Sequence, residues 1–235
     1  MMKLAVMQPY IFPYIGYFQL IQAVNTFVFY DDVNYIKGGW INRNRILMNG
    51  KDFFLTVPCQ KASPNRQIKD ILFDRNRPEF QNLLKNIYQA YRKAPYFENI
   101  YPITEAILNT DAETISELAI QSIIQVSDYL KLNRLFKVSS CDFAETKGMD
   151  RTDRLIEICR MQGATQYINA VGGIELYDKT YFKNAGIELS FIKTDSTIRY
   201  KQGKNDFVPW LSIIDVLMYN DKEEVKKLLT KYRLV

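Results

Sequence analysis

Residues 30–46, with the sequence YDDVNYIKGGWINRNRI, gather many of the side-chain types that carry out chemistry in proteins. The acidic pair Asp31 and Asp32 is suited to act as a general base or to hold a cation. The indole of Trp40 can stack on a sugar or a base. The cations suited to clamping a phosphate or a carboxylate are Lys37, Arg43 and Arg45. A solvated loop followed by a salt-bridged strand is the alternative interpretation, but this crowding of specific donors favours a site.

The segment QPYIFPYIGYFQL, residues 8–20, is a second candidate because it follows an apolar run that predicts a strand. Within it, Tyr14-Ile15-Gly16-Tyr17 has the spacing of the His-x-Gly-His signature that nucleotidyl-transferring enzymes place at a strand-to-helix turn, yet the chain contains no histidine. Gly16 would let a ligand approach the backbone, and a helix beginning near Ile15 would direct free amides at a phosphate. Packing of the aromatic residues onto a sheet explains the pattern alone equally well.

Two weaker signals follow later in the chain. Residues 150–154, DRTDR, begin a predicted helix, where capping accounts for the carboxylates and leaves Arg154 available as a ligand contact. The pair Gly172 and Gly173 follows a predicted strand and marks either a turn or a place of close ligand approach.

Residues 200–215 combine Gln202, Ser212 and Asp215. Because Ser212 and Asp215 are three residues apart, a helix cap is the default explanation for them. The chain contains no Gly-x-Ser-x-Gly elbow or Walker loop, and its three cysteines have no histidine to activate them. The sequence therefore predicts no nucleophilic triad.

Composition limits the class of protein. The 235 residues are 47% hydrophobic and 24% charged with a net charge of +5, which is typical of a globular domain and favours phosphate-bearing small molecules over nucleic acid. No run approaches the ~20 apolar residues needed to cross a bilayer, and the first residues lack the features of a signal peptide. We therefore expect a cytoplasmic protein with no membrane partner and with reduced cysteines.

The elements that must position these residues begin with a strand at 3–7, a helix at 18–24 and a strand at 26–30. Such a unit closes most naturally with its two strands parallel. Ligands bind beyond the carboxyl ends of parallel strands, where residues 8–20 and the pair Asp31 and Asp32 would both lie. We therefore predict an α/β fold with a parallel-sheet, Rossmann-like core.

The remaining pattern fits one α/β domain over residues 1–235, with a helical insertion at 78–132. Asn49-Gly50 predicts a hairpin between strands at 45–48 and 52–57. Thr110 or Asp111 is the predicted N-cap of a helix at 111–130. The other predicted helices span 78–91, 150–161, 211–218 and 222–232, and the other predicted strands span 135–138, 166–170 and 188–193.

Four stretches, in this order, resemble the WbqC family. They are QPYIFPYIGYFQLI, FVFYDDVNYIKGGWINRNRI with FLTVP behind it, DRLIEICRMQGATQYINAVGG, and YKQGKNDFVPWLSIIDVL. Members of that family are typically encoded with enzymes for bacterial O-antigens, which are part of lipopolysaccharide, and for other surface polysaccharides, so the resemblance implies work on activated sugars. The opening segment is also similar, more remotely, to the nucleotidyltransferase scaffold.

The resemblance implies a transferase that attaches an acyl or aminoacyl group to the amine of a nucleotide-linked amino sugar. The expected partners are this sugar and a small acyl or aminoacyl donor. An ATP-dependent nucleotidyltransferase or ligase and a non-catalytic sugar-nucleotide-binding protein are the alternatives. No cofactor is implied apart from Mg²⁺ if a nucleoside triphosphate is used.

In this hypothesis, Asp31 or Asp32 takes a proton from the attacking ammonium, while cations hold the phosphates or the donor carboxylate. The catalytic residues are predicted to be Asp31, Asp32 and Lys37. The predicted substrate-binding residues are Gln8, Tyr10, Tyr14, Gly16, Tyr17, Tyr35, Trp40, Asn42, Arg43, Asn44, Arg45, Arg154, Gly172, Gly173, Gln202, Ser212 and Asp215.

Overall fold

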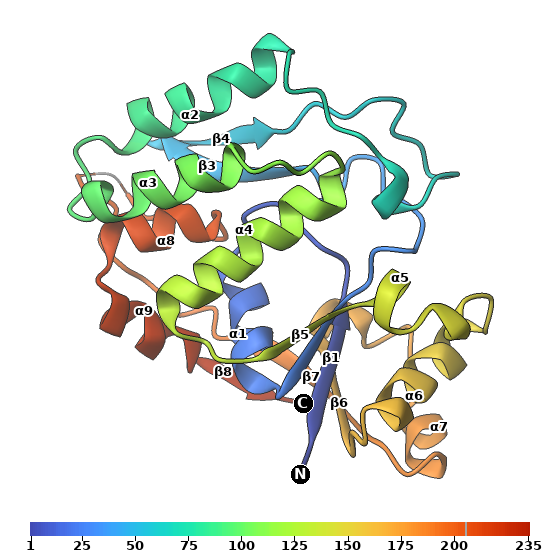
Figure 1. Ribbon diagram of the computed structural model, residues 1–235. Helices are drawn as coiled ribbons and strands as arrows, with labels where there is room; N and C mark the ends of the chain where they lie inside the picture. Colours follow the sequence, from blue (N-terminus) through green and yellow to red (C-terminus); the bar gives the residue numbers. More distant parts are fainter. Residues whose placement is uncertain (205) are drawn as a thin grey trace.

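The fold is built on a six-stranded sheet (Figure 1). The computed structural model describes residues 1–204 and 206–235. The strands in spatial order are β5 (Leu135–Val138), β2 (Thr26–Phe29), β1 (Lys3–Met7), β6 (Gln166–Ala170), β7 (Glu188–Thr194) and β8 (Tyr232–Leu234). The first five are parallel, whereas β8 pairs antiparallel with β7. The predicted α/β fold with a mostly parallel sheet is confirmed.

The order of the strands defines where a ligand would bind. From β1 the chain moves outward through β2 to β5, and it then returns to the other side of β1 to form β6 and β7. The direction of winding therefore reverses between β1 and β6. In open parallel sheets, the crevice beyond the carboxyl ends of the strands at such a reversal is the usual binding site.

The first strand, helix and strand form as the sequence predicts. Strands β1 and β2 pair in parallel from Leu4 opposite Thr26 to Met7 opposite Phe29. Between them, α1 (Ile15–Ala23) begins directly after Tyr14, its N-cap residue, whose backbone is extended, three residues earlier than the apolar spacing of residues 18–24 indicated. The opening segment 8–14 is thus the connection between the end of β1 and the start of α1.

A separate two-stranded hairpin is formed by β3 (Arg43–Met48) and β4 (Lys51–Thr56). Its turn consists of Asn49 and Gly50, with φ of 52° and 77°. Positive φ at both central residues is the requirement of the type I′ turn, which Asn-Gly meets at low cost. The predicted hairpin is confirmed, with each strand a residue or two longer or shifted.

Three helices follow the hairpin: α2 (Pro78–Tyr91), α3 (Phe97–Leu108) and α4 (Ile115–Leu130). The sequence predicted α2 but not α3, which contains Pro102. The predicted N-cap of α4 at Thr110 or Asp111 is wrong. Thr114 fills that position in a reciprocal capping box with Glu117, because its hydroxyl accepts from the Glu117 amide.

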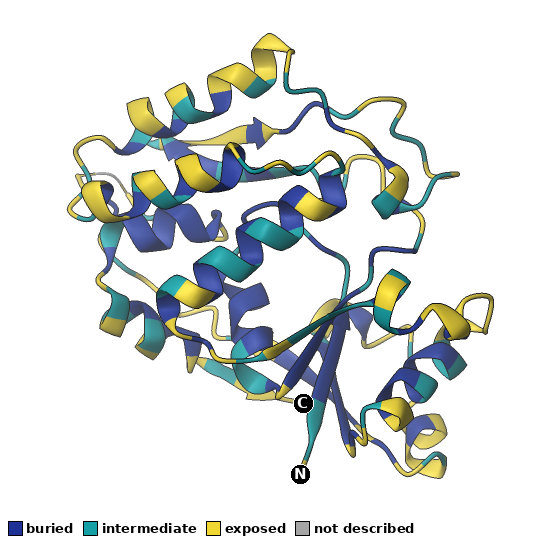
Figure 2. Cartoon of the chain, viewed as in Figure 1, coloured by how far each residue is buried: buried dark blue, intermediate teal, exposed yellow. Residues whose placement is uncertain are grey.

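The central strands are mostly buried (Figure 2), and their alternate residues face two different hydrophobic layers. Ala5, Phe27 and Phe29 pack in the cluster that also contains side chains of α1, α4 and α9 (Lys222–Leu229). Leu4, Val6 and Val28 pack in the cluster with α6 (Arg151–Met161) and α7 (Lys179–Asn184). Both faces of the sheet are covered, as the apolar strand sequences require.

The remaining elements are short. They are α5 (Ser139–Asp142), α8 (Ile213–Tyr219) and the 3₁₀ turns at Ile68–Asp70, Ala144–Thr146 and Val171–Gly173. The predicted helix over 222–232 is too long, because α9 ends at Leu229 and the chain then pairs with β7 as the edge strand β8. Among the described residues, we find no helix with the length and apolar character that a bilayer span requires.

Candidate functional site

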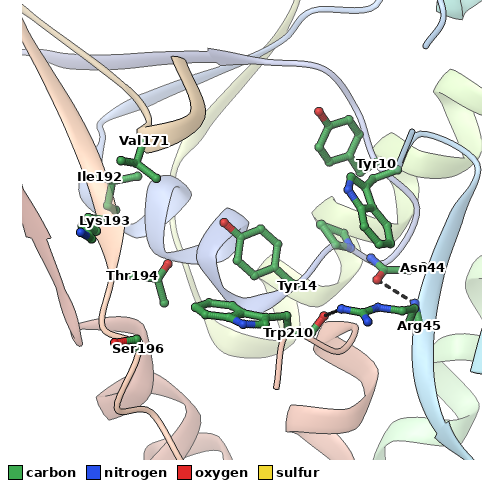
Figure 3. A pocket seen from close by; sticks show the side chains of 12 residues that line it. Tyr10, Tyr14, Asn44, Arg45, Val171, Ile192, Lys193, Thr194, Ser196 and Trp210 are labelled. Carbon is green, nitrogen blue, oxygen red and sulfur yellow. Dashed lines mark hydrogen bonds between the residues drawn. The ribbon is translucent and has the colours of Figure 1, made fainter. Parts of the chain in front are cut away.

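A cavity of about 470 Å³ opens beyond the carboxyl ends of β1, β6 and β7 (Figure 3). This position is the crevice at the reversal of strand order. The residues that line it are Tyr10, Pro13, Tyr14, Trp40, Asn44, Arg45, Val171, Ile192, Lys193, Thr194, Ser196 and Trp210. The two candidate segments at residues 8–20 and 30–46, together with Val171 just before the pair Gly172 and Gly173, all contribute to this one cavity.

Aromatic side chains form most of the wall. Tyr10, Tyr14, Trp40 and Trp210 all line the cavity. The rings of Tyr14 and Trp210 meet edge to face, with centroids 6.1 Å apart. Trp40 and Trp210 leave 43% and 46% of their surface exposed, a large fraction for indoles. Exposed aromatic faces around a concave site are suited to holding a flat ring or the apolar face of a sugar.

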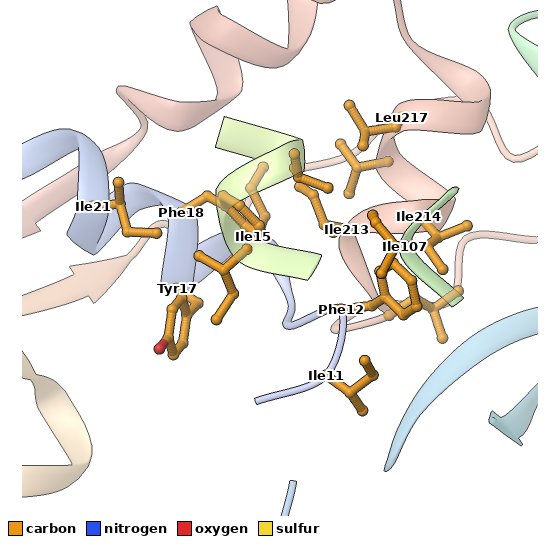
Figure 4. Packing of buried hydrophobic residues seen from close by; sticks show 14 of the residues in the cluster. Ile11, Phe12, Ile15, Tyr17, Phe18, Ile21, Ile107, Ile213, Ile214 and Leu217 are labelled. Atoms are coloured by element: carbon orange, nitrogen blue, oxygen red, sulfur yellow. The ribbon is translucent and has the colours of Figure 1, made fainter. Parts of the chain in front are cut away.

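The opening segment packs and lines the cavity at the same time, since its side chains point in two directions. Ile11 and Phe12 are each only 3% exposed and lie in the core with Ile107 and Ile213 (Figure 4). The neighbouring tyrosines, Tyr10 and Tyr14, line the cavity instead. The sequence pattern left open whether this segment packs onto the sheet or lines a binding site. In the structure it does the first with Ile11 and Phe12, and it lines a cavity with Tyr10 and Tyr14.

Two polar side chains fix the backbone of this segment. The carbonyl of Phe12 accepts hydrogen bonds from Asn44 Nδ2 and from Ser212 Oγ, both at 2.8 Å. Ser212 also donates its amide to the carbonyl of Arg45 at 2.8 Å and caps α8 through the amide of Ile214. Phe12 has a φ of 41°, so these bonds hold a left-handed backbone that a phenylalanine rarely adopts.

Gly16 is required by the position of Tyr14. A Cβ on Gly16 would lie 2.4 Å from Cε2 of Tyr14 and 2.5 Å from its Cζ and hydroxyl oxygen. The phenol therefore lies over the first turn of α1, where a phosphate would have to bind if it used the helix N-terminus. Gly16 makes room for this ring, and the predicted approach of a ligand to its backbone would require the ring to move.

Arg45 contributes a guanidinium group to the wall of the cavity. Its Nη1 lies 3.0 Å from Asp52 Oδ2, its Nη2 donates to the carbonyl of Trp210 at 3.4 Å, and its Cζ lies 5.7 Å from the ring centre of Trp40. Its Nε is buried and has no hydrogen-bond partner among the described residues. Arg45 thus joins the hairpin to both tryptophans and keeps one donor unused.

The tyrosines of the cavity are neutral at physiological pH. Burial, and then the proximity of Tyr14, raise the pKa of Tyr10 to about 12. Burial also raises the pKa of Tyr14, against a smaller lowering by a hydrogen bond with Thr194. Both phenols therefore keep their protons, so each can donate a hydrogen bond and neither serves as a base. Among the described residues, no carboxylate lines the cavity.

The acidic pair lies outside the cavity, at the ends of β2 and β5. Asp31 accepts bonds from the hydroxyl and the amide of Ser140 at 2.7 Å and 3.0 Å, and it shares the single proton of the Ser139 hydroxyl with Asp32. Asp32 accepts from Ser139 at 2.5 Å and from Arg154 Nη2 at 2.6 Å. Both aspartates are 4% exposed. The structure therefore gives these three predicted site residues, Arg154 included, partners within the fold.

Hydrogen bonds and charge decide the ionisation of Asp32. Burial alone would raise its pKa, but the hydrogen bonds from Arg154 and Ser139 and the charge of Arg154 hold the pKa below its ordinary value. Arg154 also donates from Nε to the Thr146 hydroxyl at 2.9 Å and lies over the ring of Tyr30. This cluster is a buried, hydrogen-bonded ion pair that ties α6 to the end of β2.

Most other residues of the 30–46 stretch stabilise its own loop. Tyr35 donates to Asn42 Oδ1 at 2.7 Å, and Asn42 donates to the carbonyl of Val57 at 2.8 Å. Arg43 donates to the carbonyls of Gly38 and Gly39 and lies over the ring of Phe54. Lys37 is exposed and does not line the cavity.

Asp215 and Gln202 belong to a second buried network. Asp215 accepts bonds from the hydroxyls of Tyr91 and Tyr200 at 2.8 Å and 2.7 Å, and from Gln202 Nε2 at 2.7 Å. Burial raises the pKa of Asp215, and these three donors lower it by less. The predicted capping role of Asp215 is wrong, because its carboxylate bonds to side chains across the core, whereas Ser212 does cap α8.

The other predicted site residues lie at the margins. The Tyr17 hydroxyl donates to the carbonyl of Gln8 at 2.9 Å and so stabilises the backbone directly after β1. A Cβ on Gly173 would lie 2.7 Å from Asn169 Nδ2, so that glycine permits close packing. Gly172 has open space around it. None of these residues lines the cavity.

Seven of the lining residues were outside the predicted site: Pro13, Val171, Ile192, Lys193, Thr194, Ser196 and Trp210. Four of them belong to the end of β7 and the turn behind it. Their position at the carboxyl end of a predicted parallel strand was the signal that could have identified them. Within the described part of the chain, no three acidic or cysteine side chains lie close enough to hold a metal ion together.

Known proteins match the chain over most of its length. The profile of the WbqC-like protein family matches residues 8–227. "Uncharacterized protein Rv1507c" of Mycobacterium tuberculosis (strain ATCC 25618 / H37Rv) is 29% identical over 221 residues, which cover 92% of this chain and 93% of that protein. No solved structure matches the chain at a significant level. Since the family profile spans nearly the whole sequence, the chain belongs to the WbqC-like protein family.

Proposed function

We propose that this protein binds a nucleotide-linked amino sugar in the cavity and transfers an acyl or aminoacyl group to the sugar's amine. The observation that carries the proposal is the aromatic-walled cavity of about 470 Å³ at the reversal of strand order. That volume lies within the range of small-molecule sites, and the position is the one such sheets use for nucleotides. The setting that we propose is the cytoplasmic synthesis of bacterial surface polysaccharides such as O-antigen, and membership of the WbqC-like family supports it.

The proposed reaction forms an amide. The nitrogen of the sugar amine bonds to the carbonyl carbon of the donor, the bond from that carbon to the leaving heteroatom breaks, and the amine loses a proton that the leaving group or solvent accepts. Binding both molecules with the two atoms in contact would supply much of the rate, because it removes the entropic cost of their meeting.

The chain's own residues would orient the substrate. Trp40 and Trp210 would hold its ring, while the neutral phenols of Tyr10 and Tyr14 would donate hydrogen bonds to its oxygens. Arg45 would attract a carboxylate or phosphate through the positive charge of its guanidinium. We do not retain Asp31 and Asp32 as the base in this proposal, since Ser139, Ser140 and Arg154 already bond to their oxygens.

The test is to incubate the purified protein with nucleotide-linked amino sugars and a panel of acyl and aminoacyl donors. Mass spectrometry of the sugar nucleotide would show a mass gain equal to the acyl group. Trp210→Ala should reduce the rate at limiting sugar nucleotide, whereas Tyr181→Ala, which removes an exposed aromatic residue from α7, should not. No product with any donor, from a folded protein, would refute the transferase proposal.

A non-catalytic sugar-nucleotide-binding protein is the second candidate. It is favoured by one observation, that no carboxylate lines the cavity among the described residues. In that case calorimetry would show tight binding of a sugar nucleotide without turnover. The ATP-dependent alternative is less well supported because the Tyr14 ring covers the helix start. It would be revealed by Mg²⁺-dependent release of pyrophosphate from ATP.

A further inference from the structure

A second recess opens beside the cavity, at the edge of the sheet where β7 ends and the antiparallel β8 begins. Its volume is about 400 Å³. It is lined by Lys193, Thr194, Asp195, Ser196, Lys231, Tyr232 and Arg233. Lys193, Thr194 and Ser196 also line the cavity, so the two spaces share a wall. We call this second space the basic recess.

Two cations of the basic recess are direct cross-strand neighbours. Lys193 on β7 lies opposite Arg233 on β8 in the antiparallel register. Like charges placed directly opposite in such a pair destabilise the sheet. Lys231 adds a third cation to the same recess. Among the described residues, none of the three has an ion-pair partner within 4.0 Å.

The single acid of the recess does not neutralise these cations. Asp195 accepts hydrogen bonds at Oδ1 from the amide and the hydroxyl of Thr197, at 2.8 Å and 2.7 Å. Those bonds, more than the charges of Lys231 and Arg233, lower the pKa of Asp195. With three cations against one carboxylate, the recess keeps an excess of positive charge.

We propose that the basic recess binds the phosphate groups of the ligand whose ring occupies the aromatic cavity. This would explain why Lys193 lies opposite Arg233, because a multiply charged anion between them attracts both cations and outweighs their mutual repulsion. The Thr194 and Ser196 side chains lie on the shared wall, where a diphosphate passing from one space to the other would meet their hydroxyls.

The distribution of charge in the basic recess suits a phosphate. Several cations on different strands match an anion that spreads two or three charges over many oxygens. A single carboxylate would suit one guanidinium, such as Arg45, better. The inference rests on the proposed function for the identity of the ligand, but the recess itself can be tested with inorganic pyrophosphate alone.

The experiment compares the wild-type protein with Lys193→Gln/Arg233→Gln. Lys85→Gln/Lys93→Gln is the matched control, since it removes two exposed cations from the region of α2 and lowers the net charge equally. Calorimetry would measure binding of pyrophosphate, uridine and UDP to each protein. Circular dichroism and thermal unfolding would establish that the variants fold.

We expect the wild type and the control to bind pyrophosphate, and to bind UDP more tightly than uridine. In Lys193→Gln/Arg233→Gln, the affinity for pyrophosphate and UDP should fall about tenfold or more, while that for uridine stays unchanged. Without any anion, this variant should unfold at the same or a higher temperature than the wild type, because the repulsion is gone.

Equal affinity of the wild type and Lys193→Gln/Arg233→Gln for pyrophosphate, or no binding of pyrophosphate to the wild type, would overturn the inference. Neither result would contradict the proposed function. That function is refuted separately, if no sugar nucleotide binds in the cavity or no acyl transfer occurs. A loss of uridine affinity equal to that of UDP would also overturn it, because it would show a general change of the cavity.

Discussion

The ring of Tyr14 occupies the space that a side chain on Gly16 would need. An added Cβ would lie within 2.5 Å of three atoms at the far end of that ring. Because this end of a tyrosine can swing away, Gly16→Ala should fold normally and displace the phenol from the cavity wall. We expect binding of a sugar nucleotide to weaken about tenfold, the loss of one good ring contact.

A double-mutant cycle measured by calorimetry isolates this mechanism. In a Tyr14→Ala background, Gly16→Ala should cost no further affinity, because the ring that it displaces is already absent. Additive losses in the double variant would show that Gly16 acts in another way.

Both tryptophans of the chain, Trp40 and Trp210, line the cavity. Tryptophan fluorescence therefore reports on this site without a contribution from any other part of the protein. Titration with a sugar nucleotide should change the emission of the wild type, of Trp40→Phe and of Trp210→Phe. Each Trp→Ala variant should bind about tenfold more weakly, since stacking on one aromatic side chain contributes about 1–3 kcal/mol.

A ligand that binds by calorimetry but leaves both single-tryptophan signals unchanged would place the binding site elsewhere. Tyr181→Ala, at an exposed aromatic position on α7, is the matched control and should leave the titration unaltered.

The pair of Asp32 and Arg154 should contribute to stability and not to binding. Arg154→Met leaves Asp32 buried without its cation, which we expect to cost about 3–5 kcal/mol in urea unfolding. The exposed pair of Arg77 and Glu79 gives the comparison, because Glu79→Gln should cost less than about 1 kcal/mol. If Asp32→Asn/Arg154→Met regains part of the lost free energy of unfolding, the unpaired charge of Asp32 is the cause of the loss.

Asp215 and Asp32 should affect stability with opposite dependence on pH. The pKa of Asp215 is raised in the fold above its ordinary value of 3.8, so its contribution is complete below that value and is lost as the pH rises through the folded pKa. The free energy of unfolding of Asp215→Asn, relative to the wild type, should therefore increase with pH above about 4.

For Asp32 the pKa is lowered, so its contribution is complete above 3.8 and is lost as the pH falls through the folded pKa. Asp32→Asn should therefore lose more stability, relative to the wild type, at pH 5 than at pH 3. Urea unfolding across this range measures both variants, and differences independent of pH would contradict the two assignments.

Local pattern predicted most of the fold. The apolar runs of β1 and β2, the Asn49-Gly50 turn and the amphipathic spacing of α6 each specify their element without distant contacts. Helix α3 was missed because Pro102 argues against a helix, although the fold tolerates it there. Strand β8 was missed because it exists only through pairing with the edge of β7.

The site was harder to predict than the fold for the same reason. Asp31, Asp32 and Asp215 have residue types suited to catalysis, but their bonding partners are distant in sequence, as with Ser139 and Tyr200. Trp210 and Lys193 join the cavity only because the sheet brings β7 and the segment before α8 to the end of β1. The sequence shows which chemistry each side chain can carry out. Its partners in the fold determine whether the side chain is available to a ligand.

The hydrogen bonds that Asn44 and Ser212 donate to the Phe12 carbonyl have a practical consequence. Neither donor belongs to a ring-bearing side chain of the wall, so the Phe12 carbonyl keeps both partners when Tyr10, Trp40 or Trp210 is replaced. We therefore expect these three side chains to be replaceable one at a time while the backbone at Phe12 keeps its conformation. The protein is therefore a suitable starting point for changing ligand specificity by substitution of these aromatic side chains, because the backbone that carries them is held independently.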